Sequence, residues 1–594
     1  MQNEFRTGFS KVKITPPIEV GGMVGVERVI EDVYARSTVI SSGGQTIAIV
    51  LLDLMAIDRS QAEPIRRDVC RALGIPPEAL MIACTHNHSC AHLTSWMLLR
   101  PDPRKTQYLE FLRQQVVEGV RQAREAQQPA TWSWARGRVT DLARNRRLKT
   151  PDGKVRTLRR GDPASWPLMD DPAVTAGPVD EELLLLVARD GAGVVRGLLA
   201  NFGCHNTLAM MANGICPDVF GVAMAELEQP AAGVTAMITN GAEGNVDATK
   251  TIPHLGPRDF GEAQRGGKSL AGQIAGLIAG AQPLRGGRLS AAWAEASFPV
   301  NDVFREIAAG RREFVYPGLF HSEGPMPAFA AAAQTGRMPG VVQRLSLGEA
   351  TLIGLPGEIF SETQLRIKAM RPGLPTFVLG VTNEYLGYIP TAEAMAEGGY
   401  DATPSEWIRL TGEAEAIILE HVKGLMRGEA GAARPAMALR TVRPSDVPRL
   451  KEIVAMSWKD QGIAHILEKR YGVMGGKPWL EWKWPQVEKA CRETPDQVLV
   501  TEADGEVAGF AVYLLDHARK TGTVGNNAVD PKFRGLGIGK RQIARILEIL
   551  REKGMTFAEV TVALNEGHAA ARAVYEKAGF EPISDSRYMF MRLD

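Results

Sequence analysis

The sequence has few cysteines, and none of them forms a close pair. Only six of the 594 residues are cysteine, and no two are separated by two residues. So few in so long a chain exclude the disulfide framework that stabilises small secreted domains. The lack of a Cys-x-x-Cys pair also argues against a cysteine zinc knuckle. We therefore expect reduced thiols and a cytoplasmic location.

The sequence also lacks long apolar runs, and its charges nearly cancel. No stretch approaches the ~18 consecutive apolar residues of a membrane span, and the first stretch, MQNEFRTGFSKVKITPP, has no apolar signal-peptide core. With 69 basic and 68 acidic residues, the formal net charge is +1. Such a chain is not drawn to nucleic acid or to an anionic membrane. We expect neither nucleic-acid binding nor membrane insertion.

What the chain does contain is an alternation of apolar strands and amphipathic helices. Apolar runs such as 45–53 predict buried strands, and stretches such as 61–73 predict helices. This alternation is typical of a mixed α/β fold, and 594 residues are too many for one core.

One segment interrupts this alternation. Residues 424–438 are rich in glycine and alanine, have no apolar period, and follow a helix that we expect to end near Lys423. We predict an N-terminal α/β domain over 1–428, a linker over 429–437 and a second α/β domain over 438–594.

The densest group of chemically versatile side chains is a histidine-rich loop. Three of the ten histidines lie within seven residues, and this loop follows an apolar strand predicted over 79–83. In an extended loop His86 and His88 point the same way. His205 follows another predicted strand, 197–202. Two imidazoles and a carboxylate suit Zn²⁺, although spacing alone does not identify the carboxylate, and purely structural histidines are the alternative.

An ordered set of short motifs accompanies these histidines through residues 7–405. In chain order they are Gly8-Phe9-Ser10, Ile14-Thr15-Pro16-Pro17, Asp32 with Ala35-Arg36, Leu52-Asp53, the His86/His88 loop, Val179-Asp180, His205-Asn206-Thr207, Pro217-Asp218, Gly241-Ala242-Glu243-Gly244-Asn245-Val246, Pro356-Gly357-Glu358, Gly387-Tyr388 and Gly399-Tyr400. This set resembles the N-terminal domain of neutral/alkaline, non-lysosomal ceramidases. The resemblance implies an α/β amidohydrolase that uses zinc.

The family's site residues transfer one by one to this sequence. The zinc ligands that the resemblance implies are His86, His205, Glu358 and Tyr388. It also implies that His88 is a catalytic histidine beside the metal, that Arg146 contacts the substrate or oxyanion, and that Tyr400 stabilises the tetrahedral intermediate. The structural alternatives are a helix-capping role for Glu358 and core-aromatic roles for the two tyrosines.

The sequence departs from this family at one position of the site. Related ceramidases have a serine where the stretch Gly244-Asn245-Val246-Asp247 ends in a carboxylate. We therefore expect Asp247 to act in the catalytic site by binding an amine or hydroxyl of the substrate. Because a buried charge disfavours an apolar chain, we expect a small polar N-acyl compound rather than a long-chain ceramide.

The C-terminal domain contains a glycine-rich turn after a strand that we expect to end at Val529. The turn, Arg534-Gly535-Leu536-Gly537-Ile538-Gly539-Lys540, opens an amphipathic helix to Glu552. Backbone N–H groups in such a turn converge on a pyrophosphate. The turn lacks the Lys-Ser/Thr of a P-loop and the context of a dinucleotide site. The predicted cofactor-binding residues here are Val529, Arg534, Gly535, Gly537, Gly539 and Lys540.

The segment after this helix makes the turn more specific. A strand end predicted over 561–565 precedes a helix predicted over 569–578 that contains the letters AVYEKAG. The pattern closely resembles the GCN5-related N-acetyltransferase (GNAT) superfamily over nearly all of 439–592. The resemblance implies acetyl-CoA as cofactor, Asn565 as a contact to its arm, and Tyr575 as the acid that protonates the leaving thiolate. The amine acceptor is not identified.

Three functions are compatible with these features. The leading hypothesis is a bifunctional enzyme that hydrolyses the amide bond of a small N-acyl compound with zinc and acetylates an amine with acetyl-CoA. The alternative is an acetyltransferase whose ceramidase-like domain only binds a ligand. A sensor or scaffold that uses acetyl-CoA as a signal is the third, and Arg534 and Tyr575 argue against it.

Overall fold

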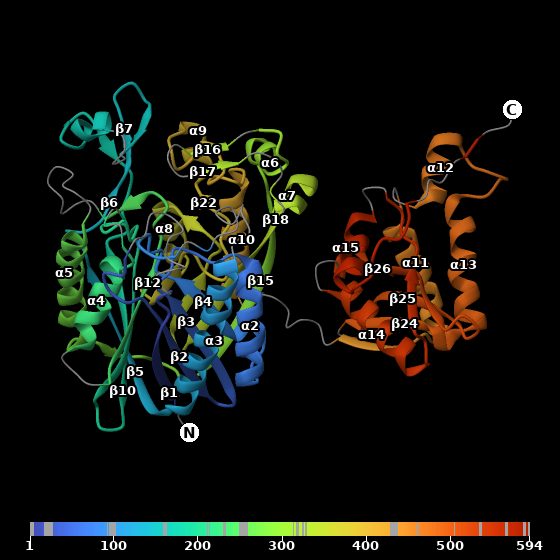
Figure 1. The fold of residues 1–594 in the computed structure, drawn as a ribbon, viewed down its shortest axis with the longest axis horizontal. Coiled ribbons are helices and arrows are strands. Elements are labelled where there is room, and N and C mark those ends of the chain that lie inside the picture. Colours follow the sequence, from blue (N-terminus) through green and yellow to red (C-terminus); the bar gives the residue numbers. More distant parts are fainter. Residues whose placement is uncertain are drawn as a thin grey trace. The chain divides into compact units, whose positions relative to one another are not determined.

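The structure, a computed structural model, divides the chain into two compact units, Met1–Gly431 and Ala432–Asp594 (Figure 1). It describes residues 5–16, 28–91, 93, 103–158, 163–210, 212, 214–229, 233–248, 259–312, 314–316, 320–322, 326, 329–427, 437–459, 462–503, 505–533, 537–564, 568–585 and 590–591. Both units combine helices with sheets, which confirms the predicted mixed α/β fold. Among these residues no helix is both long and apolar enough to cross a membrane.

The nine-stranded sheet of the N-terminal unit provides two strands that lead into the predicted metal site. Its order is β12 (Thr235–Asn240), β11 (Val195–Phe202), β10 (Glu182–Asp190), β5 (Gln128–Arg138), β1 (Phe5–Lys13), β2 (Tyr34–Ser42), β3 (Gln45–Leu52) and β4 (Leu80–Cys84), with β14 (Gln282–Pro283) paired to β5. The pairs β3–β4 and β11–β12 are parallel. Strand β4 is buried along its whole length, which explains its continuous rather than alternating apolar pattern.

Four helices of this unit pack on that sheet or on one another. They are α2 (Arg59–Leu73), α3 (Pro103–Glu125), α4 (Asp218–Glu228) and α5 (Phe260–Ile278). Helix α3 packs on β1 and β2, α4 on β12, and α5 on β5 and β10. The helix predicted over 61–73 is α2, and the strand predicted over 45–53 is β3.

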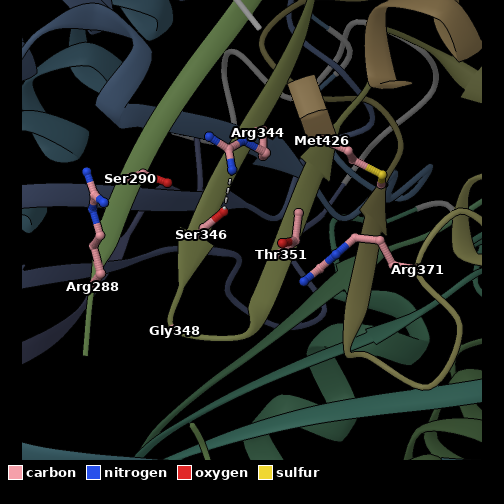
Figure 2. A pocket seen from close by; sticks show the side chains of 8 residues that line it. All are labelled: Arg288, Ser290, Arg344, Ser346, Gly348, Thr351, Arg371 and Met426. Carbon is pink, nitrogen blue, oxygen red and sulfur yellow. Dashed lines mark hydrogen bonds between the residues drawn. The ribbon is translucent and has the colours of Figure 1, made fainter. Parts of the chain in front are cut away.

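A second, four-stranded sheet completes the N-terminal unit. Its order is β15 (Leu289–Pro299), β18 (Arg337–Leu347), β19 (Ala350–Gly354) and β21 (Thr376–Leu379). Helix α10 (Glu413–Arg427) packs on β15 and β18. A pocket of about 210 Å³ lies on this sheet (Figure 2).

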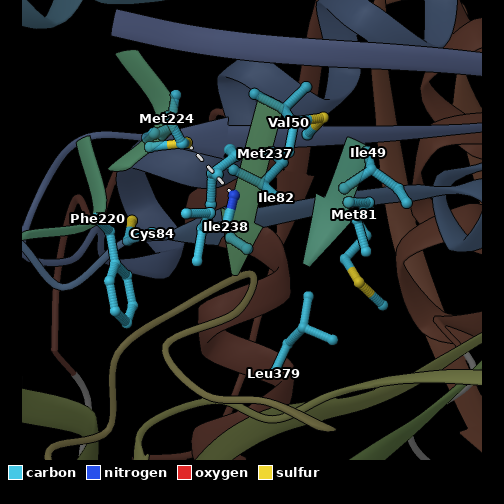
Figure 3. Close-up of a cluster of buried hydrophobic side chains, with 14 of the residues drawn as sticks. Ile49, Val50, Met81, Ile82, Cys84, Phe220, Met224, Met237, Ile238 and Leu379 are labelled. Carbon is cyan, nitrogen blue, oxygen red and sulfur yellow. Dashed lines mark hydrogen bonds between the residues drawn. The ribbon is translucent and has the colours of Figure 1, made fainter. Parts of the chain in front are cut away.

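A shared apolar core fixes the two sheets to each other. The side chains in Figure 3 come from β3, β4, α4, β12 and, from the second sheet, β21. Among them, the backbone N–H of Ile238 donates to the sulfur of Met224 over 3.3 Å. Because β4 and β12 belong to this core, the loops at their ends start from rigidly held positions.

The structure describes the elements on either side of the predicted linker. Helix α10 continues to Arg427 rather than ending near Lys423, because its buried stripe continues through Leu425. The strand after the linker begins at Met437, which pairs with Ala503. Residues 428–436 lie outside the described ranges.

The C-terminal unit is a five-stranded sheet with helices on both faces. Its order is β23 (Met437–Thr441), β24 (Val498–Ala503), β25 (Glu506–Asp516), β26 (Thr521–Val529) and β27 (Phe557–Val560), in which only β26–β27 is parallel. One apolar cluster joins the sheet to α11 (Val447–Ser457) and α13 (Trp479–Glu493). Another joins it to α14 (Ile538–Glu552) and α15 (Ala569–Lys577).

Candidate functional sites

Two loops that are distant in the sequence carry the predicted metal-site histidines. His86 lies just after β4, and His205 lies just after β11. A parallel backbone bridge between Asn87 and Asn206 holds the loops side by side. In this bridge the N–H of His88 donates to the carbonyl of Asn206 over 3.3 Å.

The turn at His86 is strained and tightly held. His86 has φ of +59°, a left-handed conformation that costs a non-glycine residue roughly 1–2 kcal/mol. The side chain of Asn87 holds the turn, donating to the carbonyl of Cys216 over 2.7 Å and accepting from the N–H of Ser89 over 2.8 Å. The expectation of an extended loop is therefore wrong. The turn nevertheless places Nε2 of His88 3.1 Å from Nε2 of His86.

The tautomers of His86 and His205 follow from their backbone contacts. Nδ1 of His86 lies 3.0 Å from the carbonyl oxygen of Met55. Nδ1 of His205 lies 2.6 Å from the carbonyl oxygen of Glu243. Since a carbonyl can only accept, each Nδ1 holds a proton, and in the neutral ring each Nε2 then presents a lone pair. Both Nε2 atoms are thus in the form that binds a metal.

These lone pairs converge on one carboxylate. Nε2 of His86 and Nε2 of His205 lie 3.5 Å and 3.0 Å from the same Oε2 of Glu358. That oxygen is buried and accepts no hydrogen bond. Two lone pairs and an anionic oxygen repel one another unless a cation lies among them. The nitrogen, nitrogen and oxygen donors match the set that Zn²⁺ prefers.

The pKa of His205 agrees with such a metal site. Burial lowers the pKa of His205, and nearby Arg146 lowers it further, so the imidazole is neutral. His86, His88 and His205 each offer a ring nitrogen, all within 4.8 Å of one another. Burial thus favours the neutral imidazole of His205, the form that binds a metal.

Two short strands place the carboxylate beside the predicted tyrosine ligand. Glu358 and Tyr388 are paired residues of the parallel strands β20 (Glu358–Ile359) and β22 (Tyr388–Ile389). The hydroxyl of Tyr388 lies 3.2 Å from Nε2 of His205, and burial raises its pKa well above the usual value. Glu358 does not cap a helix, since α8 (Ser361–Ala369) begins after it with Phe360 as its N-cap. The structure thus brings together all four predicted ligands.

A tyrosine that the sequence did not reveal completes the surroundings of this carboxylate. The hydroxyl of Tyr385 donates to Oε1 of Glu358 over 2.5 Å, which leaves Oε2 to face the histidines. In metal sites such a bond orients the ligand that it contacts. The only sequence signal was its position three residues before Tyr388.

Arg146 lies between two predicted site residues, the predicted ligand Tyr388 and the predicted catalytic Tyr400. Its Nη2 donates to the hydroxyl of Tyr388 over 3.0 Å, and its guanidinium lies 5.4 Å and 5.8 Å from the ring centroids of Tyr388 and Tyr400. Burial would lower the pKa of Arg146, but Tyr388, Asp401 and Asp247 raise it overall. A permanent cation therefore stands beside the metal-binding groups.

Asp401, a second residue that the sequence did not reveal, holds this arginine and its neighbour. It is fully buried and accepts from Nε of Arg146 over 3.3 Å and from Nη1 of Arg147 over 2.7 Å. The two arginines therefore differ in role: Arg146 reaches Tyr388, whereas Arg147 reaches the carbonyl of Gly398 over 2.8 Å.

Asp247 is buried close to the histidine loop. Its carboxylate accepts from the hydroxyl of Thr207 over 2.8 Å and from the N–H of Ala248 over 3.0 Å. Its backbone bridges that of His205. The carboxylate is thus already hydrogen-bonded, and its charge contributes to the raised pKa of Arg146.

Glu243 is a further buried acid beside the site. It is fully buried, and both of its carboxylate oxygens lack hydrogen-bond partners. Burial and the nearby charge of Glu358 raise its pKa well above the ordinary value. Its backbone carbonyl accepts from Nδ1 of His205, as described above, while its side chain lies within the core.

The structure places only part of the predicted cofactor turn in the C-terminal unit. Gly537 has φ of +76° and precedes the first residue of α14, where Gly539 and Lys540 follow. Among the described atoms, a side-chain carbon at Gly537 or Gly539 would meet none within 4 Å. Arg534, Gly535 and Asn565 lie outside the described residues.

Next to this turn the central sheet opens. Strands β26 and β27 pair only from Thr521 opposite Phe557 to Val524 opposite Val560. The strand end predicted over 561–565 is therefore wrong. The described residues 561–564 are not in a strand, because the segment after β27 no longer pairs with β26. Backbone groups of β26 after Val524, as far as Val529, have no partner in β27.

Tyr575 points its hydroxyl at this opening. The residue is buried, and its hydroxyl accepts from the side-chain amide of Asn527 on β26 over 2.7 Å. Burial raises the pKa of Tyr575, so the phenol keeps its proton at neutral pH. On the neighbouring residue Asn526, the amide oxygen accepts from Nζ of Lys483 over 2.8 Å.

The C-terminal unit is similar to known acetyltransferases. Residues 460–580 match the model of the acetyltransferase (GNAT) family, so this unit contains a GNAT domain, as the sequence predicts. L-2,4-diaminobutyric acid acetyltransferase of Nocardia farcinica is 35% identical over 74 residues, 12% of this chain and 38% of that protein. The chain spans 30–59% of the length of such curated relatives.

The N-terminal unit is similar in fold to solved ceramidase structures. A ceramidase complexed with C2 matches with a TM-score of 0.57 and 16% identity, over 72% of this chain and 76% of that one. The neutral ceramidase from Pseudomonas aeruginosa matches with a TM-score of 0.56 and 17% identity, over 72% and 75%. At this identity the likeness establishes a ceramidase-like fold, which confirms the predicted resemblance.

Proposed function

We propose that the N-terminal unit is a zinc-dependent amide hydrolase. One observation carries the proposal: Nε2 of His86 and Nε2 of His205 both lie close to Oε2 of Glu358. With the ring protons on Nδ1, none of these three atoms has a proton to donate to another. We assign these three groups and the hydroxyl of Tyr388 as the zinc ligands. Imidazole nitrogens and oxygen donors are ligand types that zinc binds.

The chain's own residues would supply the remaining chemistry. Bound zinc polarises the carbonyl and lowers the pKa of bound water to about 7. Arg146 and Tyr400 would stabilise the oxyanion, for which a single donor is worth about 3 kcal/mol. As the C–N bond breaks, the departing amine needs a proton, which His88 can deliver because its ring lies beside the ligand His86.

We expect the hydrolase to act on a small polar N-acyl compound. Asp247 lies near the cationic Arg146 and close to His205. A carboxylate there can attract an amine or a hydroxyl of the substrate, whereas an apolar chain would leave its charge poorly solvated. Asp247→Ser should therefore weaken turnover of cationic N-acyl substrates more than of neutral ones. Faster wild-type turnover of long-chain ceramide than of any small N-acyl amine would contradict this choice.

We propose that the C-terminal unit transfers an acetyl group from acetyl-CoA to an amine. The amine nitrogen attacks the thioester carbonyl, the C–S bond breaks, the thiolate takes a proton from Tyr575, and the proton released by the amine nitrogen restores the phenol. Val529 and the turn with Arg534, Gly535, Gly537, Gly539 and Lys540 would bind the cofactor, with Asn565 on its arm. The names of the relatives point to different acceptors, so they do not identify the amine that this unit would acetylate.

The alternative, a GNAT enzyme with a non-catalytic N-terminal unit, gains support from Asp247 in place of a serine. Metal content and amidase activity of the purified full chain separate the two. We expect one zinc per chain and hydrolysis of at least one member of a panel of N-acetylated amines and amino acids. Stoichiometric zinc without hydrolysis would favour the alternative, and a chain that excludes zinc would refute the proposed metal site.

A further inference from the structure

The outer face of the four-stranded sheet carries a repeated motif that the proposed activities do not use. The motif is Arg-Leu-Ser. It occurs at the start of β15, as Arg288-Leu289-Ser290, and near the end of the neighbouring β18, as Arg344-Leu345-Ser346. Leu289 and Leu345 are buried in the core. Because side chains alternate along a strand, the arginine and serine of each motif share the opposite face.

The strand register aligns three hydroxyl groups across this face. Ser290 is paired with Ser346, and Ser346 with Thr351 on β19. Figure 2 shows these side chains around the pocket with Arg288, Arg344 and Arg371. Ser346 accepts a hydrogen bond from Nη1 of Arg344 over 3.1 Å. The pocket thus combines a row of hydroxyls with three cations.

The charges of these arginines are not compensated within the pocket. Its lining contains no carboxylate; the residues are Arg288, Ser290, Arg344, Ser346, Gly348, Thr351, Arg371 and Met426. Among the described residues, none of the three arginines forms an ion pair. The nearby Glu349 binds Arg285 over 2.7 Å and offers Arg371 only its backbone carbonyl, at 3.0 Å.

Two of the arginines are also short of hydrogen-bond partners. Nε of Arg344 and Nη1 of Arg371 are buried and have none. Burial lowers the pKa of both side chains, and for Arg371 the charge of Arg344 lowers it further while the charge of Glu349 offsets part of this. Holding like charges together in this way is costly unless an anion neutralises them.

We propose that this pocket binds a phosphate group, either free or as a small phosphomonoester. A tetrahedral dianion offers several acceptor oxygens to guanidinium and hydroxyl donors from different directions, and arginine is especially suited to it. A volume of about 210 Å³ leaves room for a short organic group. The pocket lies at the beginning of β19, whereas Glu358 follows the end of that strand. The site is therefore separate from the metal centre.

The test is isothermal titration calorimetry of the full chain at fixed ionic strength, with coenzyme A present to occupy its own anion site. Inorganic phosphate and glycerol 3-phosphate are the two probes. We expect binding by the wild type and at least a tenfold weaker affinity in Arg344→Met and in Arg371→Met. Tighter binding of glycerol 3-phosphate identifies an esterified ligand, and tighter binding of inorganic phosphate a free one.

Three comparisons complete the design. Arg196→Met, which removes a partly exposed arginine paired with Asp190, should bind as the wild type does. If an arginine variant fails to fold, Ser290→Ala and Ser346→Ala test the pocket in its place. Each should weaken phosphate binding several-fold. Failure of both probes to bind the wild type at millimolar concentration, or unchanged affinity in the folded pocket variants, would overturn the proposal.

Discussion

The two units arrange their candidate chemistry in opposite ways. In the N-terminal unit, His86, His205 and Glu358 are at most 2% exposed and come from three distant segments. In the C-terminal unit, Gly537 and Lys540 of the turn are exposed, whereas Tyr575 is buried. A buried ligand set depends on every member and on the backbone that orients it, whereas an open turn distributes binding over many backbone groups. Substitutions should therefore act in an all-or-none manner in the first unit and in a graded manner in the second.

The largest effect should come from removing a histidine ligand. His205→Ala or His86→Ala should release the zinc and lower amide hydrolysis on the order of 10³-fold, since metal-assisted activation of water is lost. Metal analysis and turnover measure this directly. His421→Ala is the control, because Nδ1 of His421 contacts only its own helix carbonyl at Ile417. Full zinc occupancy in the double variant would contradict the ligand assignment.

In the C-terminal unit the corresponding change should be graded. Tyr575→Phe removes the proton donor but keeps the ring, so kcat should fall about 10²-fold while KM for acetyl-CoA stays nearly constant. Tyr513→Phe is the matched control, since this buried tyrosine of the same cluster donates only to the carbonyl of Asp496. Equal kcat values for Tyr575→Phe and the wild type would remove Tyr575 from the mechanism.

A smaller effect tests how the arginines of the N-terminal site are held. Asp401→Asn leaves Arg146 and Arg147 without their shared anion, which should lower the unfolding free energy by about 3 kcal/mol and hydrolysis roughly tenfold. Urea unfolding and turnover measure the two effects. Glu306→Gln, which breaks an exposed pair with Arg311, should leave the stability nearly unchanged, because solvent screens such a pair. Equal stability losses in both variants would show that Asp401 contributes no more than a surface charge.

The smallest effect concerns the pH dependence of the N-terminal unit. Burial raises the pKa of Glu406 to about 7, from 4.5. The folded state therefore holds this proton more tightly than the unfolded state, so stability falls as the pH rises from about 4.5 to 7, by about 2 kcal/mol. Unfolding of Glu406→Gln should depend less on pH across this window than unfolding of the wild type. A steeper dependence in the variant would show that the sign is wrong.

The sequence allowed the elements that bear the sites to be predicted, but only part of their chemistry. Buried strands such as β4 and β11 are visible because burial on both faces leaves a continuous apolar run. The partners of the ligands are not visible in this way. Tyr385 and Asp401 act through contacts with Glu358 and Arg146 that only the tertiary fold creates.

The wrong strand end at 561–565 has a similar cause. Val562 and Ala563 have the apolar character of a strand, yet β26 has already diverged from β27 at this point. Propensity is local, whereas strand formation requires a partner. Likewise, the left-handed turn at His86 depends on contacts from Asn87 to Cys216, far along the chain.

X-ray absorption at the zinc edge of the purified full chain tests the central claim most directly. Two imidazole nitrogens and oxygen donors, all at about 2.0–2.2 Å, are the predicted environment. The signal should disappear in the His86→Ala, His205→Ala double variant. Sulfur at about 2.3 Å, or zinc that keeps its two imidazoles in the double variant, would contradict the proposed metal centre.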